Sequence, residues 1–156
     1  KSPQPPLTTV ASVDLLQYLG TWYEIARYPH RFERGCAEVT ATYEQLPNQT
    51  IKVINQCRLP DEGNRLKTAE GLAKVVDKQS NAKLKVSFFW PFYGKYWILI
   101  LDEGYQYAVV GHPSRKYLWI LSRSPHMDES LYLELRRKIT EFGYDPAKLI
   151  RTPQDV

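Results

Sequence analysis

The sequence predicts an all-β protein, an eight-stranded up-and-down antiparallel β-barrel with one C-terminal α-helix packed on its outside. One observation is a succession of strand-like runs, and another is the turn chemistry between them, since proline, glycine, asparagine and aspartate cluster in the short connections. Consecutive strands joined by tight turns favour a barrel, which leaves no open sheet edge. The eight runs cover residues 21–28, 38–46, 50–57, 66–76, 82–89, 95–101, 105–111 and 116–123.

The hydrophobic period changes after Pro125, from about two residues to about three and a half. Apolar residues then recur on one face of a helix from about residue 128 to 142, with Asp128 at its start and Gly143 just past its end. We expect this face to pack on the outside of the barrel. A short strand near residues 149–152 should add to the sheet edge nearby.

Length and charge restrict the class of protein. A chain of 156 residues suits one domain, which we place at residues 13–156 after a polar, proline-rich leader or tether at residues 1–12. The net charge of +4 comes from 21 basic and 17 acidic residues without a basic run, so we expect no nucleic-acid partner. The sequence contains no run of eighteen apolar residues, so it predicts no membrane-spanning helix.

The first strand begins at a glycine that is followed two residues later by a tryptophan. Gly20 allows a tight entry into the strand, and Asp14 can cap a short helical turn just before it. The last barrel strand ends in Arg123, whose guanidinium can lie over the Trp22 ring if the two strand ends meet. We therefore expect Gly20, Trp22 and Arg123 to mark the closed end of the barrel.

Six segments follow one another in a fixed order: Gly20-Thr21-Trp22 with YEIAR after it, RFERG at 31–35, VTATY at 39–43, LKVSFF at 84–89, PFYG at 91–94 and YLWILSR at 117–123. In this order they resemble the lipocalin family, and more narrowly its bacterial members of the apolipoprotein D type. The similarity extends over about residues 13–152. It implies a carrier of small hydrophobic or amphiphilic molecules, commonly a lipoprotein of the bacterial outer membrane that faces the periplasm, or a periplasmic or secreted protein. A lipidated N-terminus would then supply the membrane association.

Side chains that alternate along each strand should line the inside of this barrel. Counting by twos from Trp22 sets the parity of the first strand, and the resemblance sets it for the others. Many of these residues are small, which favours a ligand cavity over a solid core. The predicted ligand-binding residues are Ala26, Tyr28, Ala41, Val53, Asn55, Ala73, Val86, Phe88, Trp90, Tyr96, Ile98, Ala108, Val110, Tyr117 and Trp119.

The predicted mouth combines aromatic and basic side chains. An apolar lumen with a partly basic rim suits an amphiphile such as a fatty acid or lysophospholipid, whose chain enters while its anionic head stays outside. Only one or two of these cations need touch a head group, because most surface charges are simply solvated. Glu24, predicted to face inward, needs a partner or a proton. The basic residues are Arg31, Arg34, Arg58, Arg65, Lys95, Arg115 and Lys116.

The two cysteines leave two hypotheses open. Strand pairing outward from the turn at Pro47 and Asn48 brings Cys36 close to Cys57, so a disulfide at the mouth is expected, in keeping with an oxidising compartment. The alternative is a free, reactive thiol in an enzyme that acts on a lipid or isoprenoid. A scavenger of oxidised lipid or pigment is a third possibility.

No sequence motif for catalysis or metal binding suggests a different function. Phosphate-binding glycine loops, zinc-ligand spacing and nucleophile elbows are absent from the sequence. We therefore expect a non-enzymatic carrier that uses neither a metal nor a cofactor and acts as a monomer or weak homodimer.

Overall fold

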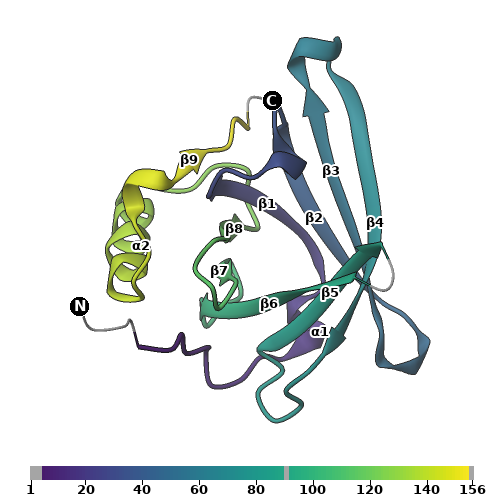
Figure 1. Ribbon diagram of the computed structural model, residues 1–156, viewed down its shortest axis with the longest axis vertical. Coiled ribbons are helices and arrows are strands. Elements are labelled where there is room, and N and C mark those ends of the chain that lie inside the picture. Colours follow the sequence, from purple (N-terminus) through teal and green to yellow (C-terminus); the bar gives the residue numbers. More distant parts are fainter. Residues whose placement is uncertain (1–4, 90–91, 155–156) are drawn as a thin grey trace.

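Eight antiparallel strands form one closed barrel in the computed structural model, which describes residues 5–89 and 92–154 (Figure 1). Each strand pairs with the next along the chain, and β1 pairs with both β8 and β2, which closes the sheet. The predicted fold class is therefore confirmed. The strands are β1 (Gly20–Arg27), β2 (Ala37–Gln45), β3 (Ile51–Leu59), β4 (Arg65–Val75), β5 (Lys83–Phe89), β6 (Phe92–Leu101), β7 (Tyr107–Gly111) and β8 (Leu118–Ser122).

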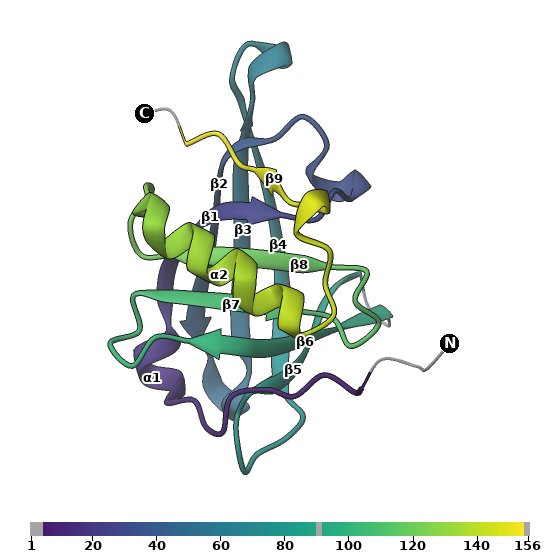
Figure 2. The same ribbon diagram turned by 90° about the vertical axis from the view of Figure 1, so that its left-hand side faces the viewer.

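Two helices flank the barrel at different places. The short α1 (Leu15–Tyr18) lies under one end, and the Asp14 carboxylate caps it by accepting a hydrogen bond from the Leu16 N–H at 3.1 Å. The longer α2 (Glu129–Glu141) lies across the outside of β7 and β8 (Figure 2). Its buried residues join an outer apolar cluster with the outward side chains of these strands. None of the described helices is long and apolar enough to cross a bilayer.

The C-terminal segment completes the barrel wall at the other end. β1 and β2 pair only as far as Tyr23 and Thr40, after which the two strands separate. β9 (Ile150–Arg151) pairs with β1 beyond that point, and the Thr152 N–H donates to the Ile25 carbonyl at 2.9 Å. The expected final strand is therefore present, and it fills the gap between the first two strands.

The hairpin of β3 and β4 extends beyond the other strands and leaves the barrel mouth open on one side (Figure 1). β4 pairs with β3 along nearly its whole length, but with β5 only from Leu72 to Val75. Ala69 has the same strand parity as the buried Ala73, yet it is exposed. Solvent therefore reaches the inner face of the wall in this part of the barrel.

Part of the N-terminal stretch, expected to be a leader or tether outside the domain, packs against the barrel. Leu7 is only 6% exposed and packs in the outer cluster, and the Val10 N–H donates to the Ile98 carbonyl at 3.0 Å. Leu7 and Val10 thus belong to the packed structure, because Leu7 packs in the outer cluster and Val10 against the inner one. The domain boundary near residue 13 stays a prediction.

Candidate functional site

The closed end is built around Trp22. The Trp22 side chain is fully buried, and its indole N–H donates to the Tyr18 carbonyl at 2.9 Å. The Arg123 guanidinium lies 3.8 Å from the centre of the Trp22 ring and donates to the carbonyls of residues 17, 21 and 105. Gly20 has φ +99°, and a Cβ there would lie 3.3 Å from Arg123 Nη1. The predicted meeting of these three residues is confirmed.

Three tyrosines form the floor of the lumen above this end. The Tyr96 hydroxyl lies 2.7 Å from that of Tyr18 and 2.8 Å from that of Tyr43. Burial raises the pKa of all three phenols, that of Tyr43 to about 12. A small apolar cavity beside them has room for roughly one water molecule. The closed half of the barrel is therefore filled by side chains.

The predicted lining residues divide between this filled half and a more open half. Val53, Ala73, Ile98, Ala108 and Val110 are buried in the inner cluster, where they act as core. The other inward residues remain partly exposed, so a ligand can reach them, although ligand binding by any of them stays a prediction. These are Ala41, Asn55, Val86, Phe88, Tyr117 and Trp119. Tyr96 is also partly exposed, but its hydroxyl belongs to the tyrosine floor of the filled half. Trp90 lies outside the described residues.

Two predicted lining residues, Ala26 and Tyr28, face the other way. A β-bulge between Glu24 and Ala26 shifts the register of β1 against β8. An extra residue in a strand reverses the alternation beyond it. Ala26 therefore packs in the outer cluster beneath α2, and the Tyr28 hydroxyl exchanges hydrogen bonds with the backbone of Asp145. The prediction that these two residues line the lumen is wrong.

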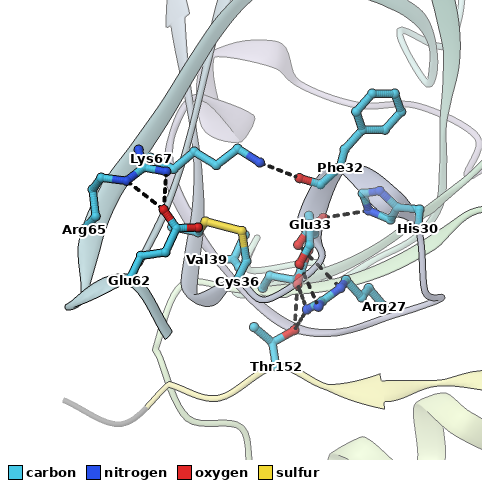
Figure 3. The surroundings of a disulfide bond; sticks show 12 residues. Arg27, His30, Phe32, Glu33, Cys36, Val39, Glu62, Arg65, Lys67 and Thr152 are labelled. Carbon is cyan, nitrogen blue, oxygen red and sulfur yellow. Dashed lines mark hydrogen bonds and ion pairs between the residues drawn. A yellow bond between two sulfur atoms is a disulfide. The ribbon is translucent and has the colours of Figure 1, made fainter. Parts of the chain in front are cut away.

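The same bulge turns Arg27 inward, where it joins a buried network at the mouth (Figure 3). Arg27 Nη1 donates to Glu24 Oε2 at 3.1 Å and to Thr152 Oγ1 at 3.2 Å. Arg27 Nη2 donates to the Glu33 carbonyl at 3.2 Å, and Nε lies 3.6 Å from Glu33 Oε1. A single guanidinium thus holds β1, the C-terminal segment and the first mouth loop together.

Glu33 reaches this network from the 3-10 helix η1 (Arg31–Glu33) in the loop between β1 and β2. Its Oε2 accepts a hydrogen bond from Trp119 Nε1 at 3.1 Å. The same oxygen lies 2.9 Å from His30 Nε2 (Figure 3). The Lys67 ammonium, from β4, donates to the Phe32 carbonyl at 3.0 Å and fixes the same loop from across the mouth.

The two carboxyl groups of the network have opposite pKa shifts. Burial, and then the negative charge of Glu33, raise the pKa of Glu24 well above its usual value. Burial would also raise the pKa of Glu33, but hydrogen bonds with His30 and Glu24 and the charge of Arg27 lower it overall. Glu24 therefore tends to keep its proton, while Glu33 carries the negative charge that balances Arg27.

The predicted disulfide joins this loop to β3. Cys36 and Cys57 are bonded, with their Cα atoms 5.5 Å apart, and they form a small buried cluster with Val39 and Leu59. The bond lies beside the Glu33 network (Figure 3). Because it uses both cysteines of the chain, neither is a free thiol.

Several of the predicted rim cations already have protein partners. Arg58 donates to the Asn64 carbonyl at 3.3 Å, and Arg65 pairs with Glu62 at 2.8 Å within the same hairpin. Arg115 donates to the Phe142 carbonyl at 2.7 Å on the outside of the barrel. These contacts support the hairpin and the helix, and they leave fewer of the rim cations for a ligand.

Comparison with known proteins gives consistent matches. A model of the lipocalin-like domain matches residues 13–154. The chain belongs to the lipocalin family. It is 46% identical over 155 residues to the outer membrane lipoprotein Blc of Escherichia coli strain K12, covering 98% of this chain and 87% of the relative. Apolipoprotein D of Rattus norvegicus is 35% identical over 162 residues, covering 99% and 82%.

Solved structures agree on the fold of this lipocalin. Insecticyanin from the tobacco hornworm Manduca sexta superposes with a TM-score of 0.76 and 21% identity, covering 96% of this chain and 85% of that one. The cockroach allergen Per a 4 gives a TM-score of 0.74 at 20% identity, covering 99% and 96%. At these identities the similarity establishes the barrel architecture alone.

Sequence reasoning missed the polar centre of this lipocalin's mouth. Alternation from Trp22 places Arg27 on the outer face, because a bulge has no simple sequence signal. Glu33 lies in a loop, where strand alternation does not predict the direction of a side chain. One signal was available, since a buried Glu24 requires a partner and Arg27 follows three residues later. Within residues 5–89 and 92–154, no group of three or more His, Cys, Asp or Glu is placed to hold a metal ion.

Proposed function

We propose that this lipocalin binds and carries an amphiphile with a long apolar chain, such as a fatty acid or a lysophospholipid, in the open half of its barrel. Family membership supports binding of a small hydrophobic molecule. The observation that carries the finer proposal is the partly exposed apolar wall formed by Ala41, Val86, Phe88 and Trp119 beside the charged mouth. Such a surface removes a lipid chain from water, while the polar mouth receives its head.

The location of the site within the barrel is testable with a matched pair of substitutions. Ala41→Trp adds a large side chain to the open half, so it should block lipid uptake and leave the fold intact. Ala73→Trp adds the same side chain to the filled half, where Ala73 is 2% exposed, so it should instead destabilise the protein by about 1 to 3 kcal/mol.

The experiment measures binding of a fluorescent long-chain fatty acid and thermal unfolding for both variants. Mass spectrometry of lipid extracted from the purified protein would identify the ligand class directly. Normal uptake by a folded Ala41→Trp variant would contradict the proposed site. A wild-type protein that neither retains nor binds lipid would contradict the proposed function.

We also propose that the protein acts at the bacterial outer membrane, facing the periplasm. Relatives named outer membrane lipoprotein Blc support this location, and so does the disulfide, because such bonds persist in oxidising compartments. Fractionation of cells that express the full precursor tests it. The thiol-dependent enzyme expected as an alternative would have no free thiol here. A pigment or oxidised-lipid scavenger and the monomeric or weakly dimeric state stay predictions.

A further inference from the structure

The Glu33 carboxylate occupies a position where hydrogen-bond donors from three parts of the fold converge. Arg27 comes from β1, Trp119 from β8, and His30 from the loop between β1 and β2. Trp119 Nε1 and His30 Nε2 both contact Glu33 Oε2, at 3.1 and 2.9 Å. A few convergent donors, one of them a guanidinium, are well suited to bind a carboxylate.

Glu33 satisfies these donors incompletely. Arg27 Nε is buried without a hydrogen-bond partner, because the nearest Glu33 oxygen, Oε1, lies 3.6 Å away. A buried polar atom without a partner costs roughly 1 to 3 kcal/mol. A carboxylate that is not tethered to the loop could approach Arg27 more closely and use both oxygens.

The loop that carries Glu33 can move without breaking the barrel. Residues 31–35 lie between β1 and β2 and take no part in strand pairing, so their displacement removes none. His30 can stay in place, because its ring packs against Tyr117 and Trp119 of the barrel wall. Three contacts hold the turn near its tip: Glu33 itself, the bond from Arg27 to the Glu33 carbonyl and the bond from Lys67 to the Phe32 carbonyl. Phe32 is 56% exposed at this tip, so little apolar burial there opposes the movement.

The charge of this network determines which kind of lipid head group can replace the Glu33 carboxylate. Burial holds the pKa of Glu24 well above its usual value, so Glu33 supplies the negative charge opposite Arg27. Without Glu33, the charge opposite Arg27 has to come either from ionisation of the buried Glu24, 3.1 Å away, or from an incoming anion. An anionic head group supplies this charge without ionising Glu24, whereas a neutral head group does not.

We propose that Glu33 occupies the head-group site of an anionic lipid, and that the carboxylate of a fatty acid displaces it to bind Arg27, His30 and Trp119. The lipid chain would then extend along the partly exposed wall near Ala41 and Phe88. This inference rests on the proposed function and specifies its ligand, because it makes the lumen selective for a free carboxylate over a neutral head.

The test compares a long-chain fatty acid with the fatty alcohol of the same chain length. Glu33→Gln keeps the size of the side chain but removes the competing charge, so it should tighten fatty-acid binding by about tenfold and change alcohol binding by less than about twofold. Glu62→Gln is the matched control, since it removes an equal charge from an exposed pair at the same mouth. It should leave both affinities unchanged.

Each outcome separates this inference from the proposed function. Equal tightening of acid and alcohol in Glu33→Gln would show that the loop is only a steric plug, and an unchanged acid affinity would place the head group elsewhere. Either result overturns the inference while wild-type lipid binding sustains the function. Failure of every variant and of wild type to bind either lipid overturns both.

A second measurement uses the wild-type protein and does not depend on a variant that folds. Displacement of Glu33 should free the backbone of η1, whose amides at residues 33 and 34 donate to carbonyls within the same turn. Hydrogen exchange of these amides should accelerate when fatty acid binds and not when the alcohol binds. Unchanged or slower exchange with the fatty acid would overturn the proposed displacement.

Discussion

Arg123 supports the closed end through four contacts, so Arg123→Ala should destabilise the protein without affecting ligand uptake. The guanidinium lies 3.8 Å from the centre of the Trp22 ring and donates to three backbone carbonyls at 2.7 to 3.2 Å. The ring contact contributes about 1 kcal/mol at a partly exposed site. The three carbonyls can recover water in the variant, so their loss adds roughly 1 to 2 kcal/mol in total.

The expected decrease in the free energy of unfolding is therefore about 2 to 3 kcal/mol, or a Tm lower by about 4 to 10 °C. Urea denaturation followed by tryptophan fluorescence measures it. Arg123→Lys should lose about half as much, because it keeps a charge over Trp22 but not the planar fork. Lys83→Ala is a control that removes a cation 4.4 Å from the Trp97 ring, and it should cost less than about 1 kcal/mol.

Two results would refute this reasoning. An Arg123→Ala variant that unfolds at the wild-type urea concentration would mean that the cation–π contact and the three hydrogen bonds contribute nothing net. A variant with wild-type stability that no longer takes up lipid would mean that Arg123 lies at the ligand-binding end, and the assignment of the two barrel ends would be wrong.

Two further predictions concern the mouth. Replacing both Cys36 and Cys57 by Ser should lower the free energy of unfolding by about 3 kcal/mol, because the bond closes a loop across a sequence separation of 21. Urea denaturation with and without reductant checks this, and equal stability of wild type and variant without reductant would contradict it. Glu24→Gln mimics the protonated acid. Since the folded pKa of Glu24 is raised, its contribution to stability is present below the usual value of 4.5 and lost as pH rises through the folded pKa. The variant should therefore gain stability relative to wild type as the pH rises above 4.5, and a pH-independent difference would contradict the raised pKa.

The closed end shows how far local sequence could predict the site. Gly20, Trp22 and Arg123 stand at strand ends, and an up-and-down barrel brings the ends of its first and last strands together, so their contact followed from order alone. The disulfide followed in the same way, because the hairpin register of β2 and β3 brings Cys36 near Cys57. Both predictions depended on pairing between neighbouring strands.

The lumen was harder to predict because alternation is reliable only until a strand is interrupted. The bulge in β1 reversed the faces of Ala26 and Tyr28 and turned Arg27 inward. The residue types around Glu24 and Ala26 do not predict the bulge. It occurs where β1 leaves β2 and pairs with the C-terminal segment, more than a hundred residues away along the chain.

The sequence by itself determined the eight strands, their order, the outer helix and the two cysteines that meet, since turn chemistry, hydrophobic period and neighbouring pairing are local properties. Only the tertiary structure decided which half of the lumen is filled and which side chains carry the charge at its mouth. Side-chain volume has to be summed across all strands before a cavity is known, and the three tyrosine hydroxyls meet from α1, β2 and β6. The network of Glu24, Arg27 and Glu33 likewise depends on burial, which is a property of the assembled barrel.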